Sequence, residues 1–382
     1  MKRIARGAAS LYLTHHRTER TAGVALTASG RVDAREDGWR GDNAVALWLG
    51  IIAAMVALTA IIGAATRLTG SGLSITEWQP ILGVIPPLNE ADWLDAFAKY
   101  KEIPQYVELN HGMSLEAFKA IYWWEWTHRL IARSIGVVFL VPFLAFLALK
   151  RIPRRLAPRL VLLFALGGLQ GAIGWIMVQS GLVDRVSVHP LKLMLHLGCA
   201  VLIFALLVWT TFETAERRDR PAHLATVPLS AVLGASVLVA LIYLQILSGA
   251  LVAGLKAGMT YNTWPLMDGH FIPEGLGTLS PWWSNIVANI TTVQFNHRML
   301  AYLVVAFGLW RAAGMWRSAD DETVRHSAQW LGLALIGQMA LGIWTLLAWV
   351  PLPLGVAHQA GALTVLALAL RHLFTVRRAR AD

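Results

Sequence analysis

Eight long apolar stretches dominate this sequence and restrict it to one kind of fold. They lie at about residues 45–66, 118–149, 159–180, 190–211, 226–254, 287–313, 326–350 and 355–376. Each holds roughly the 20 residues that a helix needs to cross the hydrocarbon core of a bilayer. The mean hydropathy of +0.53 is also too high for an ordinary soluble domain. We therefore predict an all-α integral membrane protein with eight transmembrane helices.

Basic residues beside the apolar stretches predict how the chain crosses the membrane. Arginine and lysine gather at 150–159, 217–220 and 311–325 and in the C-terminal tail, and the net charge is +10. By the positive-inside rule these segments face the cytoplasm, as do both termini. The connection at 67–117 is acidic on balance and is expected outside. This distribution indicates that the positive charge serves the orientation of the chain in a lipid bilayer and does not bind nucleic acid.

The second half of the sequence repeats the first. Trp78 aligns with Trp264, and the glycines around the two tryptophans then coincide, Gly63 with Gly249, Gly72 with Gly258 and Gly83 with Gly269. The likeness continues as WTHRL against FNHRM, GLQGAIGW against GQMALGIW, and LMLHLG against GVAHQAG. Because each unit holds an even number of helices, both copies cross in the same direction. We predict two parallel-repeated four-helix bundles related by a pseudo-twofold axis along the membrane normal.

The repeat sets the predicted boundaries of the chain's parts. They are a polar, basic, cytoplasmic N-terminal segment (1–44), an N-terminal four-helix half (45–211), a cytoplasmic linker (212–225), a C-terminal four-helix half (226–376) and a basic tail (377–382). The first segment lacks the apolar core of a cleaved signal peptide.

Four histidines lie inside the apolar stretches as two matched pairs, His128 with His196 and His297 with His358. A titratable side chain within a bilayer is costly and is usually functional. Counting about 1.5 Å per residue from the cytoplasmic ends of the helices places all four in the outer leaflet. One such histidine can simply form a hydrogen bond between helices. Four on alternate helices, in repeated positions, favour two metal or heme sites.

A bis-histidine heme suits these residues better than other metal centres. Zinc prefers three or four ligands with carboxylates or thiolates among them. A di-iron bundle uses two Glu-x-x-His motifs, and only Glu125-Trp-Thr-His128 occurs. The single cysteine, Cys199, excludes a cysteine-rich cluster. Glycine-rich helices with one histidine each let a flat macrocycle approach the backbone.

Three arginines are candidates to pair with heme propionates. Arg129 and Arg298 directly follow a histidine, and Arg67 begins the first outer connection. The alternative interpretation is that these side chains only reach the membrane interface with their charged ends.

Glu125 makes the two halves unequal. It lies one turn before His128 on the same face of the helix, and the equivalent residue of the second half is Gln294. A partly desolvated carboxylate is suited to acid–base catalysis. The difference indicates that one pair of histidines serves chemistry and the other electron transfer. The alternative is a structural ion pair between Glu125 and Arg129 or Arg133.

Several stretches together resemble heme A synthase. They are RLTGSGLSITEWQPILGVIPPLNEADWLDAFAKYKEIPQY in the first outer connection, then EWTHR, FNHR and AHQ. The resemblance covers about residues 45–376 and is closest to the branch of alphaproteobacteria and mitochondria. A different bacterial branch carries a cysteine pair in an outer loop, and this sequence has none there.

The resemblance implies an enzyme of the bacterial inner membrane that serves the biogenesis of cytochrome oxidase. Such an oxidoreductase oxidises the C8 methyl group of heme O to the formyl group of heme A, with oxygen from water. The resemblance further implies that His297 and His358 hold the iron of a resident heme b, through which electrons leave. His128 and His196 then match the site of the substrate heme O, and Glu125 matches the catalytic glutamate.

Partners and rival functions follow from the same residues. The resemblance suggests the heme O synthase, a farnesyltransferase, as a partner, and a homo-oligomer is one of the open alternatives. A diheme b-type cytochrome that only transfers electrons explains the four histidines equally well, but gives Glu125 and the long outer connection no purpose. A transporter is expected to show broken helices and inverted repeats, which the sequence lacks.

Overall fold

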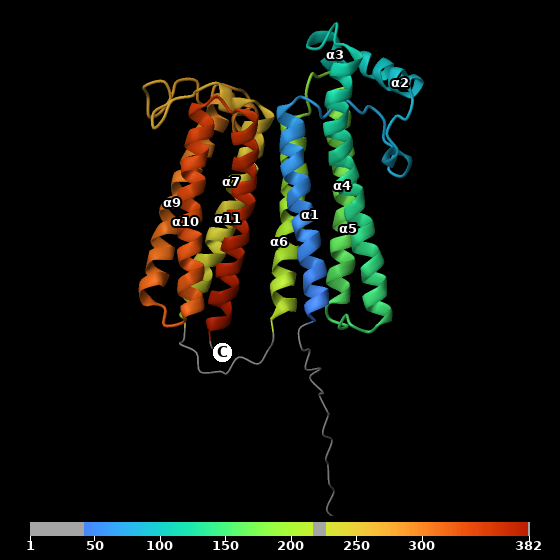
Figure 1. Ribbon diagram of the computed structural model, residues 1–382. Coiled ribbons are helices and arrows are strands. Elements are labelled where there is room, and N and C mark those ends of the chain that lie inside the picture. Colours follow the sequence, from blue (N-terminus) through green and yellow to red (C-terminus); the bar gives the residue numbers. More distant parts are fainter. Residues whose placement is uncertain (1–41, 217–226, 381–382) are drawn as a thin grey trace, which may run out of the picture. The chain divides into compact units, whose positions relative to one another are not determined.

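The computed structural model describes residues 42–216 and 227–380, and this part of the chain is helical, without a strand (Figure 1). Most of the predicted N-terminal segment, most of the predicted linker and the last two residues of the tail lie outside the described residues. The boundaries expected for these segments therefore stay predictions.

Eight of the described helices are long and apolar enough to cross a membrane, as predicted. They are α1 (Asn43–Leu68), α4 (Leu115–Ala148), α5 (Ala157–Leu182), α6 (Pro190–Ala215), α7 (Leu229–Gly254), α9 (Ile290–Ser318), α10 (Glu322–Leu347) and α11 (Leu352–Ala379). Their ends differ from the predicted ones by a few residues. The chain is a multi-pass membrane protein.

The ends of these helices follow local sequence signals. The Asp42 carboxylate accepts hydrogen bonds from the backbone N–H groups of Ala44 and Val45 at the start of α1, and Ser114 caps α4 in the same way. Such caps satisfy donors that the first turn of a helix leaves free. Proline opens α6 at its first position, where the missing N–H costs nothing.

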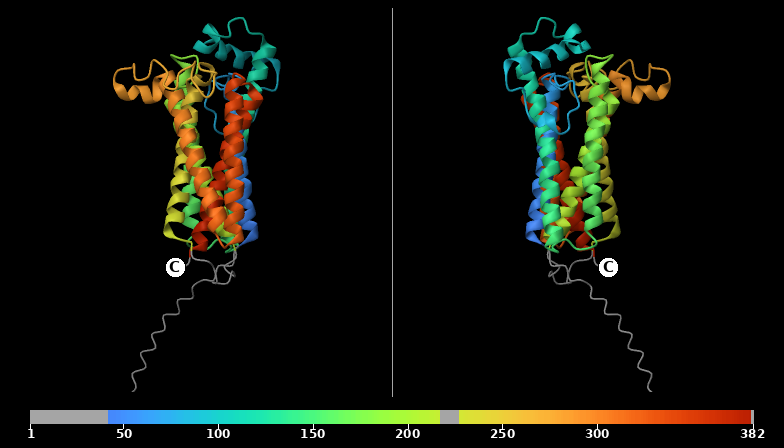
Figure 2. Two further views of the ribbon diagram at one scale, coloured as in Figure 1. Left: turned by 90° about the vertical axis from the view of Figure 1, so that its left-hand side faces the viewer. Right: turned by 90° about the vertical axis from the view of Figure 1, so that its right-hand side faces the viewer.

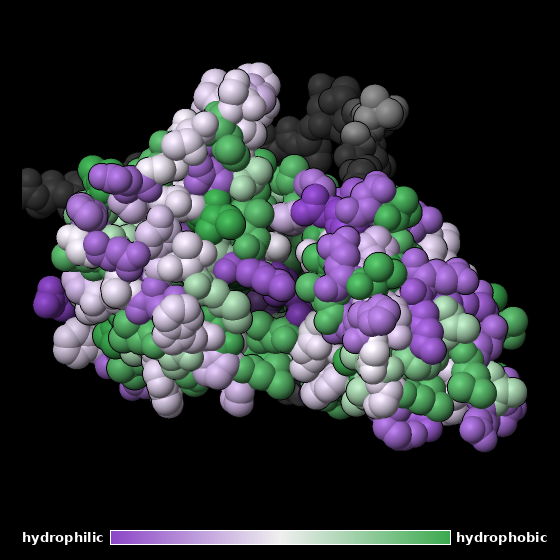
Figure 3. All heavy atoms as spheres, turned by 90° about the horizontal axis from the view of Figure 1, so that it is seen from above, coloured by the Kyte–Doolittle hydropathy of each residue, from purple (hydrophilic) through white to green (hydrophobic). Residues whose placement is uncertain are grey.

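Both long connections lie at one end of the bundle, which we call the loop end (Figures 1 and 2). The first connection, 69–114, carries the short helices η1 (Leu82–Val84), α2 (Glu90–Lys101) and α3 (Pro104–Glu108). The second, 255–289, carries η2 (Ala257–Met259), η3 (Trp282–Ser284) and α8 (Asn285–Ala288). Seen from above, hydrophilic side chains are spread among apolar ones on this face (Figure 3).

The helices pack in a similar order in the two halves. In the first half α1 packs on α4 and on α6, and α5 packs on α6. In the second half α7 packs on α9 and on α11, and α10 packs on both α9 and α11. The halves meet where α6 contacts α7 and α11, and where α1 contacts α11. A rotational axis relating the halves stays a prediction.

The first connection is fixed to the loop end by an aromatic cluster and a buried hydrogen-bond network. Side chains of α2 and α3 pack on the start of α4 around the fully buried rings of Tyr100 and Phe118. The Gln105 amide donates to the carbonyl of Gly70 at 3.0 Å and accepts from the Tyr100 hydroxyl at 3.0 Å. Burial raises the pKa of Tyr100, so the phenol stays protonated and keeps donating.

We expect Gln105→Ala to destabilise this end of the molecule. The substitution leaves the Gly70 carbonyl and the Tyr100 hydroxyl short of a partner in a buried place, which costs about 1–3 kcal/mol. Thermal unfolding of the purified protein in detergent measures the loss. The control is Gln79→Ala, which removes only an exposed hydrogen bond to Glu77, and an equal effect of both changes would contradict the account.

Candidate functional site

All four intramembrane histidines lie near the loop end, since α4, α6, α9 and α11 all begin there. In each case the imidazole packs against a glycine on the preceding long helix. A Cβ atom on that glycine would lie close to Cε1 of the histidine, at 2.9 Å for Gly63 and His128, 2.8 Å for Gly174 and His196, 3.2 Å for Gly249 and His297, and 2.8 Å for Gly342 and His358. Only glycine leaves room for the ring at this distance.

Three of the histidines are also held by a glutamine that lies one turn before the glycine. The amide nitrogens of Gln170, Gln245 and Gln338 donate to the histidine's own backbone carbonyl at 3.0, 3.1 and 2.9 Å. Each also lies 3.1 Å from Nδ1 of the ring. The amide nitrogen is nearer to Nδ1 than to Nε2, and Nε2 is free for a metal only in the tautomer that carries the proton on Nδ1.

His128 is the exception among the four. Threonine, Thr59, takes the place of the glutamine, and its hydroxyl donates to Met55 within its own helix. Nδ1 of His128 is buried and makes no hydrogen bond within the described residues. The four histidine positions are therefore alike in packing and different in how firmly each ring is held.

His297 carries a further hydrogen bond that the other three histidines do not share. The Ser248 hydroxyl lies 2.7 Å from Nδ1 of His297 and 3.0 Å from the backbone carbonyl of Gln245. A hydroxyl that donates to the carbonyl can accept a hydrogen bond from Nδ1–H. Such a bond fixes the tautomer in which Nε2 is free for a metal.

The four histidines fall two to each half, His128 and His196 in the first and His297 and His358 in the second. Within residues 42–216 and 227–380, no group of three or more histidine, cysteine or carboxylate residues is arranged to hold a metal ion. All four rings are only partly covered by protein, although each lies between helices.

Glu125 is buried beside the first pair and is fully hydrogen-bonded. Its Oε2 accepts from the Ser74 hydroxyl at 2.7 Å and from the Ile75 backbone N–H at 2.8 Å. Its Oε1 pairs with the Arg129 guanidinium at 2.5 Å. The ion pair that the sequence left open is thus with Arg129, while Arg133 donates to the carbonyls of Gln79 and Pro80.

The second half repeats this arrangement without the carboxylate. Arg129 donates to the backbone carbonyls of Ile75 and Glu77. Arg298 correspondingly donates to those of Tyr261 and Thr263, and the Gln294 amide joins it on Tyr261. Both arginines therefore hold a connection against a helix. For the Arg67 guanidinium, by contrast, no hydrogen bond or ion pair occurs among the described residues.

Two histidines outside the pairs, His189 and His372, also make hydrogen bonds through Nδ1. His189 precedes α6, where burial, together with Arg185 and Lys192, lowers its pKa. Its neutral Nδ1 can then accept from the Leu191 backbone N–H at 3.3 Å. His372 is only 3% exposed near the far end of α11, where Nδ1 meets the Ser327 hydroxyl at 2.9 Å.

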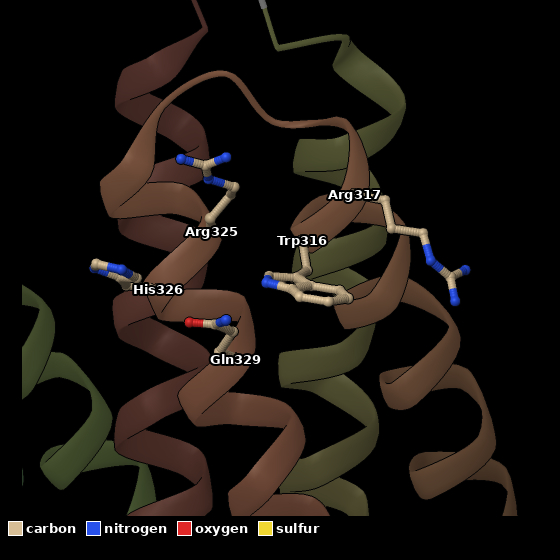
Figure 4. Close-up of a pocket in the computed structure, with 5 residues that line it drawn as sticks. All are labelled: Trp316, Arg317, Arg325, His326 and Gln329. Atoms are coloured by element: carbon tan, nitrogen blue, oxygen red, sulfur yellow. The ribbon is translucent and has the colours of Figure 1, made fainter.

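An open pocket of about 330 Å³ lies at the end of α9 and α10 away from the loop end. It is lined by Trp316, Arg317, Arg325, His326 and Gln329. Figure 4 shows the Arg317 side chain turned away from Arg325. The two cations do not converge, and the pocket is separate from the histidine pairs.

The sequence interpretation missed the residues that hold the rings. It used the glycines as room for a macrocycle, whereas four of them face the imidazoles directly. The signal was present as a glutamine or threonine four residues before a glycine in the apolar stretch that precedes each histidine. The sequence was compared as two halves. Alignment of the four helix pairs, each with one of the histidines in its second helix, would have revealed this pattern.

These features define a class: a multi-pass helical membrane protein with two intramembrane histidine pairs. Comparison with known families makes the class specific. Residues 46–370 match the COX15-CtaA family, described as cytochrome oxidase assembly protein. The chain belongs to this family.

Similar curated proteins carry the name heme A synthase. One from Parvibaculum lavamentivorans is 47% identical over 343 residues, which cover 90% of this chain and 97% of the relative. One from Rhodopseudomonas palustris is 51% identical over 333 residues, covering 87% and 90%. One from Mesorhizobium japonicum is 49% identical over 349 residues, covering 91% and 95%. The resemblance to heme A synthase expected from the sequence is confirmed.

Arg129 is expected to be essential for the stability of the first connection. Arg129→Ala leaves the Glu125 carboxylate buried without its counter-ion, which costs about 3–5 kcal/mol. We expect a lower unfolding temperature and faster proteolysis of residues 69–88. Lys119→Ala, which breaks the surface ion pair with Glu116 and the contact of its ammonium with the Trp93 ring, is the control and should cost about 2 kcal/mol or less. An intact connection in Arg129→Ala would refute this role.

Proposed function

We propose that this protein is a heme A synthase that converts heme O to heme A. The observation that carries the proposal is the inequality of two similar histidine pairs, of which only the first has a buried carboxylate, Glu125, one turn away. The names of the relatives and the membership of the family support it. The proposal assigns chemistry to the first pair and electron transfer to the second.

The residues of the second pair fit a resident heme b with bis-histidine ligation. His297 and His358 would hold the iron through Nε2, and when bound the heme accepts electrons one at a time. Ser248 supplies the acceptor that Nδ1–H of His297 needs. The buried Oε1 atoms of Gln245 and Gln338 have no partner within the described residues. The amide nitrogen of each glutamine is committed to the backbone carbonyl of its histidine, so Ser248 is the acceptor that the structure offers to Nδ1–H of His297.

The first pair is proposed as the site of the substrate. His128 and His196 would bind heme O or hold its edge, and Arg67, whose guanidinium has no partner among the described residues, is the arginine best suited to a propionate. Arg129 and Arg298 remain proposed partners of heme propionates, and each also donates to backbone carbonyls of a connection. Electrons would pass from the first pair to the second within one protein.

Glu125 is proposed to manage the protons of the reaction. Oxidation of a methyl to a formyl group takes up one water and releases four protons and four electrons. The carboxylate accepts hydrogen bonds from the Ser74 hydroxyl, the Ile75 N–H and Arg129, and it would exchange protons with the reacting groups. Ser74 belongs to the first connection, so its hydrogen bond joins the Glu125 carboxylate to the loop end of the molecule.

The same proposal includes the orientation of the protein in the membrane and its partners. The loop end would face outward, because arginines gather at the opposite helix ends, which places both histidine pairs in the outer leaflet of the bacterial inner membrane and both termini in the cytoplasm. The heme O synthase is proposed as the source of substrate. A homo-oligomer is compatible with this arrangement and is not required by it.

Replacement of the carboxylate tests the catalytic assignment. We expect Glu125→Gln, which installs the residue of the second half, to lower heme A formation by about 10²–10⁴-fold, the usual contribution of a general base. The b-type absorption spectrum should persist. The control is Glu116→Gln in the exposed first turn of α4. Heme A formed by the Glu125 variant at the wild-type rate would sink the assignment.

Loss of a ligand tests the resident site. His297→Ala and His358→Ala should each abolish the b-type spectrum of the purified protein, because one imidazole cannot supply both axial ligands. His372→Ala removes another buried histidine of the same half and should leave the spectrum unchanged. If the spectrum survives both ligand changes, the assignment of the second pair is wrong.

A further inference from the structure

The two halves differ in how tightly the edge helices pack. In the second half α9 and α10 contact each other along their length, whereas the equivalent helices α4 and α5 of the first half touch at few positions. The apolar centres of α4 and α5 are also the least buried of the eight spans. The first half is therefore open on one side, between α4 and α5.

This opening has defined upper and lower limits. Toward the loop end, Trp78 of the first connection stacks on Trp175 of α5, with ring centroids 5.7 Å apart. Toward the other end, Phe139 of α4 contacts Phe164 of α5, with centroids 5.6 Å apart. We call the part between these contacts, residues 128–136 of α4 and 167–174 of α5, the α4–α5 window.

Glycines on α5 account for the opening. No other group lies within 4 Å of where a Cβ atom would be on Gly167, Gly168 or Gly171. The alignment of Gln170 with Gln338 puts Leu335, Ile336 and Met339 at these positions of α10. Leu335 is only 2% exposed, and its side chain fills the space beside Gly308 of α9. Leu335 thus closes the second half at a position where the first half has Gly167, whereas Ile336 is 53% exposed.

Polar atoms beside the window point to a ligand. Nδ1 of His128, on α4, and Oε1 of Gln170, on α5, are both buried and have no hydrogen-bond partner among the described residues. Orphaned polar atoms in such a place are costly. His128 is also the one histidine of the four without a glutamine, because Thr59 stands in its place. Its ring packs against Gly63 but lacks the glutamine contact of the other three.

We propose that the α4–α5 window is the lateral opening through which the heme substrate passes between the lipid and the first histidine pair. This inference rests on the proposed function. Apolar side chains flank it, with Val137 63% and Leu169 50% exposed. Arg129 and Arg133 on the same stretch of α4 bind carbonyls of the first connection, and the Trp78–Trp175 stack covers the end next to the loops. A lipid-dissolved macrocycle with an isoprenoid tail suits such an opening, whereas a water-borne ligand does not.

The closed second half fits the complementary task. A resident heme must stay through many turnovers, and the packed α9–α10 edge would retain it. The substrate must arrive and leave at each turnover, and the glycines of α5 permit this. His128, held by neither glutamine nor serine, becomes the exchangeable ligand of the pair.

Filling the window tests the proposal. The variant Gly167→Leu with Gly171→Met installs the side chains of the second half, in the full chain reconstituted in nanodiscs and carrying its b-type heme. Vesicles loaded with heme O are added, and pigments bound to the re-isolated protein are followed with time by chromatography. Overpacking of this size should slow heme O uptake by about tenfold or more. Gly337→Leu, on α10 and equally unobstructed, is the control and should bind heme O normally.

A second variant, Gly136→Leu on the α4 side of the window, should slow uptake in the same way and serves if the first does not fold. An unchanged b-type spectrum shows that each variant is intact. Uptake at the wild-type rate in both variants, or equal slowing in Gly337→Leu, overturns the window. Wild-type protein that takes up heme O without forming heme A refutes the proposed function and leaves the window standing.

Discussion

The contact of an imidazole with a glycine backbone is the interaction on which the rest of this structure depends. It occurs four times, between Gly63 and His128, Gly174 and His196, Gly249 and His297, and Gly342 and His358. A side chain would collide with the ring at Gly63, Gly174 and Gly342 and would press on it at Gly249, so the contact sets how closely consecutive long helices approach near the loop end. Within a bilayer, where apolar burial provides little force between helices, such close approach and interhelical hydrogen bonds hold a bundle together. The glutamines one turn away add those hydrogen bonds in three of the four places.

Small departures from this common plan give the two halves different properties. Ser248 is added beside His297, and Thr59 replaces the glutamine beside His128. Glu125 is placed one turn before His128, where the second half has Gln294. Glycines on α5 stand where α10 has larger side chains. These differences leave the second pair more firmly held and place a buried carboxylate beside the first.

The sequence predicted the parts of this architecture that depend on periodicity and repetition. Eight apolar runs of about 20 residues can only be helices in a bilayer, and the matched histidines and Glu125 were found from spacing alone. Contacts that depend on the register between helices could not be predicted in this way. Arg129 and Arg298 bind backbone carbonyls of the connections, and no residue pattern marks a carbonyl as an acceptor. The packing difference between α4–α5 and α9–α10 likewise depends on the separation of the helices. Three glycines influence this separation, but their presence in the sequence does not predict it.

The central claim is that the two histidine pairs hold different hemes, one resident and one being converted. Extraction of the pigments from the purified wild-type protein, followed by chromatography, tests it most directly. The account predicts heme B together with heme O or heme A. Heme B alone, in protein that had been exposed to heme O, would contradict it and would favour a diheme cytochrome that only transfers electrons.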